Sequence, residues 1–225
     1  MRTLSIRLLP LSVLLLLAAT AFALQKPKVI TFGKPYSVKL FIGPDEDNTV
    51  PMKIRSLSVD GRIREFTTGE SHEITDRIFA VRRAYRLNNS LPEDESKVPD
   101  WIWQRGGWLM VDRLNGRVSQ LKLVNFDSFY SEASWFRDYV AYCGVSDAGD
   151  KLYAVVVQWG ARKPLLMKEL GTVPEKSETP ESYCEAPVWE RKPTRVIFRP
   201  RQSEKFSYTV FSHSVDAQPG STDEE

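Results

Sequence analysis

Apolar and polar positions along the chain alternate with the two-residue period of β-strands, and short polar turns interrupt them. In residues 52–66 and 108–124, alternating runs flank an Asp-Gly and an Asn-Gly pair. A type I′ turn needs positive φ at both central residues, which glycine adopts freely and Asn or Asp tolerates. Both segments are therefore predicted to be β-hairpins, and residues 138–159 form a third with a slightly longer turn.

Further segments rich in β-branched and aromatic residues predict more strands. They are residues 37–42, 77–87, 164–170, 194–198 and 206–211. The run Val155–Val157 is apolar on both faces, which is typical of a central, covered strand. Only residues 126–138 suggest a helical turn or two, without a clean 3.6-residue period. About ten to twelve strands predict an all-β chain of antiparallel hairpins.

The first 23 residues differ from the rest of the chain. Arg2 and Arg7 precede a leucine-rich run that ends in a small-x-small site at Ala23. This order is typical of a secretory signal peptide, so we expect a secreted or periplasmic protein with no stable membrane anchoring after cleavage. The alternative is an uncleaved anchor, but Pro10 interrupts a run that needs about 20 continuous apolar residues to span a bilayer.

Charge changes the picture once this segment is removed. The whole chain has 31 basic and 29 acidic residues, and loss of Arg2 and Arg7 leaves equal numbers. A neutral chain has no global field that attracts nucleic acid, so no nucleic-acid partner is expected. Basic residues that gather in residues 191–205 alternate with apolar ones, which is typical of a strand whose charges protect a sheet edge.

Two cysteines, Cys143 and Cys184, both lie in the exported part of the chain. An even count in an oxidising compartment predicts a disulfide, which would pin the proline-rich stretch around Cys184 onto the strand that holds Cys143. Redox catalysis needs a Cys-x-x-Cys spacing or an activating neighbour, and neither is present. The two histidines, His72 and His213, have no ligand spacing with the cysteines, so we expect no metal site and no cofactor.

About 200 residues remain after cleavage, which is enough for one core. We predict a signal peptide at 1–23, a single all-β domain at 24–213 and a disordered acidic tail at 214–225. Residues 88–100 are polar and acidic with two prolines, and they predict a long surface loop inside a hairpin.

Two stretches, WLMVDRLNGRVSQL at 108–121 and SWFRDYVAYCGVSDAGDKLYAVV at 134–156, resemble blades of exported β-propellers of the TolB-like and quinoprotein-like kinds. The chain as a whole resembles secreted bacterial proteins with no assigned activity. The blade resemblance implies a partial or small propeller-like assembly that binds partners and does no catalysis. A two-sheet β-sandwich is the alternative, because the same hairpins build either architecture.

The segment WIWQRGGW carries the strongest signal for binding, with Trp101, Trp103 and Trp108 around Arg105. Tryptophan offers a flat apolar face and one hydrogen-bond donor, which suits a protein or glycan partner. Arg105 can stack across a ring. The alternative is that Trp101 and Trp103 share one strand face and point into the core.

Candidate catalytic residues gather only around His72, which has Ser71, Glu73 and Asp76 as neighbours. These types occur in nucleophilic hydrolases, but the chain has no nucleophile elbow, phosphate loop, paired-histidine zinc motif or calcium loop. We therefore expect a secreted, non-catalytic binding or structural module. The alternative is a secreted hydrolase with a site near His72.

Overall fold

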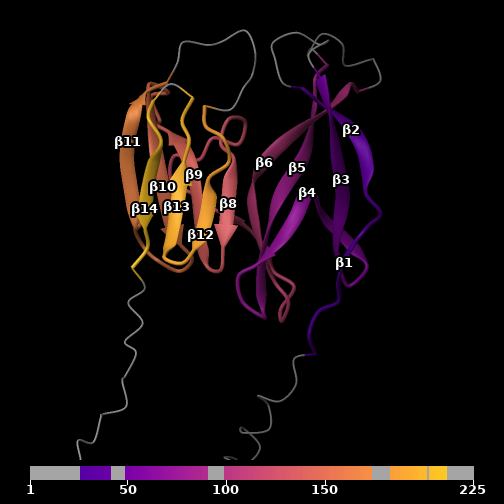
Figure 1. The fold of residues 1–225 in the computed structure, drawn as a ribbon. Helices are drawn as coiled ribbons and strands as arrows, with labels where there is room; N and C mark the ends of the chain where they lie inside the picture. The colour runs from indigo at the N-terminus through magenta and orange to yellow at the C-terminus, as the bar shows by residue number, and fades with distance from the viewer. Residues whose placement is uncertain (1–25, 42–48, 91–98, 174–182, 202, 212–225) are drawn as a thin grey trace, which may run out of the picture.

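The computed structural model describes residues 26–41, 49–90, 99–173, 183–201 and 203–211. Fourteen strands and no helix make up this described part, so the all-β prediction is confirmed. The predicted signal peptide and the whole of the predicted tail lie outside it. The strands form two lobes that lie side by side, β1–β7 and β8–β14 (Figure 1).

The first lobe is one strongly coiled sheet. Its strands are β1 (Ile30–Phe32), β2 (Tyr36–Phe41), β3 (Thr49–Val59), β4 (Arg62–Glu73), β5 (Ile78–Asn88), β6 (Trp101–Asp112) and β7 (Val118–Leu121). Strands β2 to β6 pair in sequence as antiparallel neighbours, and β2 also pairs in parallel with β6 through Leu40 and Trp103. These five strands therefore close into a ring, while β1 pairs with β3 and β7 pairs with β6.

Turn chemistry sets the hairpins of this lobe. Asp60 and Gly61 have φ of 50° and 75°, as a tight turn between β3 and β4 requires. In the β6–β7 turn, Gly116 has φ of 70°, and an added Cβ would lie 2.6 Å from a methyl of Val59. The predicted hairpin around residues 88–100 is also confirmed, because Asn88 pairs with Trp101.

Both faces of this sheet are apolar. On β5, Phe79 and Val81 pack in one cluster with Leu57 of β3. Ala80 and Ala84, which alternate with them, belong to clusters on the opposite face. One of these clusters, with Ala80 and Trp108, is covered by side chains from beyond β7, so this face of the first lobe carries the second lobe.

The second lobe contains two sheets that pack face to face (Figure 1). One has four strands in the order β11-β10-β9-β8, and the other has three in the order β12-β13-β14. Their bounds are β8 (Ala133–Phe136), β9 (Tyr139–Val145), β10 (Lys151–Gln158), β11 (Leu166–Thr172), β12 (Val188–Arg191), β13 (Thr194–Phe198) and β14 (Phe206–Thr209). Ala154 and Val156 of β10 meet Val196 and Phe198 of β13 in a common core. The choice between a propeller-like assembly and a two-sheet sandwich for the whole chain stays a prediction.

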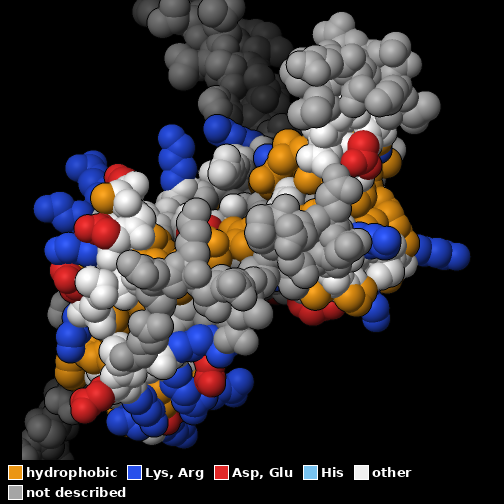
Figure 2. Space-filling view, turned by 90° about the horizontal axis from the view of Figure 1, so that it is seen from above, with side chains coloured by type: hydrophobic (Ala, Val, Ile, Leu, Met, Phe, Trp, Pro, Cys, Tyr) orange, Lys and Arg blue, Asp and Glu red, His pale blue; other side chains and the backbone are white. Residues whose placement is uncertain are grey.

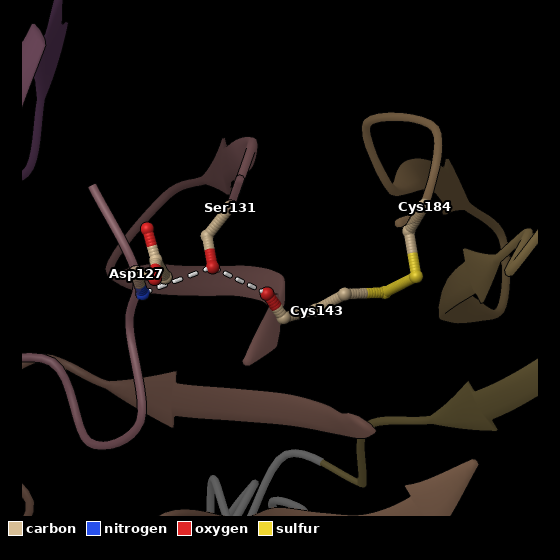
Figure 3. Close-up of a disulfide and its surroundings, with 4 residues drawn as sticks. All are labelled: Asp127, Ser131, Cys143 and Cys184. Atoms are coloured by element: carbon tan, nitrogen blue, oxygen red, sulfur yellow. Dashed lines mark hydrogen bonds between the residues drawn. A yellow bond between two sulfur atoms is a disulfide. The ribbon is translucent and has the colours of Figure 1, made fainter. Parts of the chain in front are cut away.

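The predicted disulfide is present. Cys143 on β9 is bonded to Cys184, which pairs with Pro200 just beyond β13 (Figure 3). The backbone beside it is also held, because the Ser131 hydroxyl donates a hydrogen bond of 2.6 Å to the Cys143 carbonyl. The amide of Asp127 donates to the same Ser131 oxygen. The crosslink therefore ties β9 to the segment that precedes β12. Through Ser131, the same part of β9 also contacts the segment that connects the lobes.

Of two further expectations from the sequence, one was confirmed and one was wrong. Residues 126–138 make a single helical turn, in which the amide of Ser131 donates to the Asp127 carbonyl, and then form β8. The Asp127 carboxylate accepts the amides of Phe129 and Tyr130 and closes an Asx turn. The basic strand β13 lies in the middle of its sheet and is not an edge.

Carboxylates offset part of the basic charge on β13. Basic side chains gather at the lower left of Figure 2, on the second lobe, with acidic side chains among them. Arg195 on β13 pairs with Glu190, and Arg199, just beyond this strand, pairs with Glu185. Arg195 and its partner on β12 lie opposite each other in the strand register, so this pair also supports the pairing of the two strands.

We expect a Cys143→Ala/Cys184→Ala double variant to lose about 4 kcal/mol of unfolding free energy, because the bond closes a loop of 41 residues. Urea denaturation of the variant and of the oxidised protein measures this loss. Reduced wild-type protein is the control that separates loss of the crosslink from loss of buried sulfur. A loss under about 1 kcal/mol would contradict the prediction.

The ends of two hairpins are tied by Arg77 and Asp112, whose Nε–Oδ1 distance is 2.8 Å. The Arg77 guanidinium lowers the pKa of Asp112 from its ordinary 3.8 to about 2. Because the folded pKa is below the unfolded one, the stabilisation is complete above about pH 4 and is lost as the pH falls towards 2. Asp112→Asn should flatten unfolding free energy against pH in this window. Asp147→Asn, in the exposed β9–β10 turn, is the control, and equal profiles for both variants would refute the assignment.

Candidate binding groove between the lobes

A groove of about 390 Å³ opens where the five-stranded ring meets the start of β8. Every strand of the ring contributes to its wall. The lining residues are Leu40, Val50, Pro51, Met52, Lys53, Thr68, Gly69, Glu70, Arg82, Arg105, Trp108, Glu132 and Ala133. The groove therefore exists only because the ring closes and because the connecting segment, residues 122–132, brings Glu132 against it.

The connecting segment is held by Arg82 of β5, which is only 5% exposed. Its Nε donates a hydrogen bond of 2.6 Å to the Gly106 carbonyl of β6. Its two terminal nitrogens donate to the carbonyls of Ser128 and Ser131 at 2.7 and 3.3 Å. Glycine at position 106 lets the strands approach closely, since an added Cβ would lie 3.0 Å from the Cβ of Arg83. One side chain thus joins β5, β6 and the connecting segment.

The charge of Arg82 has no carboxylate in direct contact among the described residues, because all three of its hydrogen-bond acceptors are neutral carbonyls. Burial lowers its pKa to about 10, while the charge of Glu132 acts in the opposite direction. The guanidinium also lies 4.9 Å from the ring centre of Phe126, a cation–π distance. Arg82 is therefore a buried cation that is hydrogen-bonded but not neutralised.

Next to it, Arg105 of β6 forms an ion pair with Glu132 of the connecting segment. The two side chains are 30% and 38% exposed, so the pair lies at the surface of the groove. Glu70 on the rim is 94% exposed and only 3.8 Å from Arg55, a loose contact. Apolar residues, among them Leu40 and Met52, share the lining with these charged groups.

The four residues predicted for binding all lie on β6 but have different surroundings. Trp101 is 48% exposed with the Arg86 guanidinium 4.5 Å from its ring, and Trp103 is half-buried with its ring 5.2 Å from that of Phe66. Trp108 is 8% exposed and packs edge-on against Trp135 of β8. Only Arg105 and Trp108 line the groove.

Sequence reasoning missed Arg82 and Glu132. The available signal for Arg82 was an arginine directly after the apolar run at 78–81, a position where a buried cation needs hydrogen-bond acceptors. Nothing in the sequence pointed to Glu132, because its role depends on how the connecting segment lies against β6.

His72 has a packing role in the structure. Its Nε2 lies 2.6 Å from the carbonyl oxygen of Arg137, which can only accept, so this nitrogen carries the hydrogen. Its ring stacks on Trp135 at 5.3 Å. The neighbouring Glu73 is held by Arg113, which lowers the pKa of this carboxyl. His72 therefore joins β4 to the β8–β9 turn, and no serine or carboxylate of the described chain is hydrogen-bonded to its ring.

Comparisons with known proteins found no family model that matches the chain, and no curated protein or solved structure with significant similarity to it. Within the described ranges, no group of three or more His, Cys, Asp or Glu side chains is placed to hold a metal ion. The same part of the chain contains no helix with the length and apolar character that a bilayer span requires. What the groove can do must therefore be argued from its own geometry.

Replacing Arg82 tests its part in holding the lobes. Arg82→Met keeps an unbranched side chain but leaves three carbonyls without their donor, so we expect a loss of at least about 3 kcal/mol of unfolding free energy. Arg86→Met, four residues along the same strand at an exposed position, should cost less than about 1 kcal/mol. Urea denaturation measures both, and similar losses would show that Arg82 has no special role.

Proposed function

We propose that this protein is an exported, non-catalytic binding module that holds a partner in the groove between its lobes. The observation that carries the proposal is the groove itself. It is built by all five strands of the ring and combines an apolar wall with a few charged groups. Pockets of about 300–1,000 Å³ with this mixture are the usual form of ligand sites, and the mouths of β-barrels are a common location for them.

Export is supported by the sequence of the first 23 residues and by the disulfide. A bond between Cys143 and Cys184 is consistent with an oxidising compartment, since cytosolic thiols are kept reduced. A secreted or periplasmic location satisfies both observations. In such a location a protein or a glycan is an accessible partner, and the resemblance of residues 134–156 to propeller blades would imply the same class of function.

Binding is favoured over hydrolysis by the arrangement of the polar groups. His72, the centre of the alternative hydrolase, is occupied by the Arg137 carbonyl and by Trp135. The groove is lined by arginine, lysine, glutamate and threonine, and Thr68 donates its hydroxyl hydrogen to the Lys53 carbonyl. General-base activation of a nucleophile requires a base within hydrogen-bond reach, and no such pair occurs in this lining.

A groove-blocking variant tests the proposal. A ligand selected from a displayed peptide library or a glycan array should bind Glu70→Trp at least tenfold more weakly, because the exposed rim residue would then fill the entrance. Arg62→Trp, exposed at the other end of β4 from Glu70 and outside the groove lining, should bind normally. Calorimetry measures both affinities, and amide shifts of Glu132 and Ala133 map the site.

The proposal would be refuted by selected ligands that bind Glu70→Trp as tightly as wild type. Mass spectrometry of the ligand after incubation separates binding from turnover. Cleavage of the ligand by wild-type protein, abolished in His72→Gln, would support the hydrolase instead.

A further inference from the structure

The charges of the groove are not balanced. Three cationic side chains line it, Lys53, Arg82 and Arg105, against the two carboxylates of Glu70 and Glu132. One of these cations, Arg82, is only 5% exposed and contacts only neutral carbonyls and aromatic rings. The charges of Glu132 and Asp127 act on Arg82 without contacting it, and low-dielectric surroundings make the field of the guanidinium long-ranged. The groove therefore attracts negative charge.

A carboxylate already occupies Arg105, one of the two cations of the groove that lie near its surface. Glu132 lies on Arg105 in a contact that is partly exposed at both ends. An exposed pair of this kind contributes about 1 kcal/mol or less, so an incoming carboxylate can replace Glu132 at little cost. The released Glu132 side chain gains water, because it lies at the surface in the residue just before β8.

Part of the groove wall is apolar. Leu40 and Met52 are only 4% and 6% exposed, and they line the groove together with Val50 and Pro51. A Glu side chain has an aliphatic stem and a charged end, and it matches an apolar wall and a guanidinium in one groove. Planar, bidentate pairing with Arg suits a carboxylate, and the native Glu132 shows that this position accepts one.

We propose that the groove binds an acidic segment of a partner protein, one carboxylate of which replaces Glu132 on Arg105. This inference rests on the proposed function and names its ligand class. Arg105 contacts the ligand, Lys53 adds a second exposed cation on the β3 side, and Arg82 supplies a fixed positive field. Glu132 is then a competitor that occupies the site when the partner is absent.

The probe is an acetylated, amidated tri-glutamate peptide, with the tri-glutamine peptide as its neutral isostere. Calorimetry at low salt should show binding of tri-glutamate and at least tenfold weaker binding of tri-glutamine. Affinity for tri-glutamate should fall as sodium chloride rises from 50 to 300 mM, since exposed charges are screened. Inorganic phosphate should not displace bound tri-glutamate when it is added at the peptide concentration that saturates the site.

Variants give opposite expectations for the two members of the pair. Arg105→Gln should weaken tri-glutamate binding about tenfold, and Lys53→Gln about threefold. Glu132→Gln should strengthen it about threefold, because the competitor is gone. Lys151→Gln removes an exposed cation that is paired with Glu169 on the far sheet, so it serves as the matched control with unchanged affinity.

Several results would overturn the inference. Equal binding of the two peptides, weaker binding in both Arg105→Gln and Glu132→Gln, or displacement by phosphate alone would each do so. Should library-selected ligands be neutral but still map to Ala133 and lose affinity in Glu70→Trp, the proposed function would stand and the acidic ligand class would be wrong. Thermal denaturation of each variant shows whether it is folded. If Arg105→Gln does not fold, Lys53→Gln still tests the contribution of a groove cation.

Discussion

The arrangement of the two lobes depends on one buried guanidinium. Arg82 donates to carbonyls of β6 and of the connecting segment, so it fixes the path of the chain between the first and second lobes. Its neutral acceptors satisfy the hydrogen-bond donors but leave the charge in place. The connecting segment is also held by β9, since the Ser131 hydroxyl donates to the carbonyl of Cys143. A chain of contacts thus runs from β5 to the disulfide.

Aromatic packing supports the same boundary. Trp108 of β6 meets Trp135 of β8 edge-on, and His72 stacks on the other side of the Trp135 ring. Tyr142 on β9, whose hydroxyl donates to the carbonyl of Val124, fixes the connecting segment from the second lobe. Because the four-stranded sheet is covered on both faces, by the three-stranded sheet and by this boundary, its central strands β9 and β10 carry apolar residues on both faces.

The sequence predicted the features that depend on neighbours in the chain. The Asp-Gly pair defines the β3–β4 hairpin because Asp60 and Gly61 both adopt positive φ, and Gly116 alone supplies positive φ in the longer β6–β7 turn. The pairing of Cys143 with Cys184 followed because two cysteines allow one intramolecular bond. The parallel contact between β2 and β6 and the acceptors of Arg82 were not predictable, since they depend on residues far apart in sequence. For the same reason, the sequence could not show that Trp108 is buried while Trp101, on the same strand, is exposed.

These constraints assign different tasks to the two arginines of the groove. Arg82 cannot move towards a ligand, because three hydrogen bonds and the ring of Phe126 hold it, so its contribution to binding is a fixed field. Arg105 has one surface ion pair and can change partners without disturbing a strand. A fixed cation beside an exchangeable one separates the stability of the lobes from occupancy of the groove. Loss of the Arg105 pair should leave the fold intact, whereas loss of the Arg82 contacts removes the groove itself.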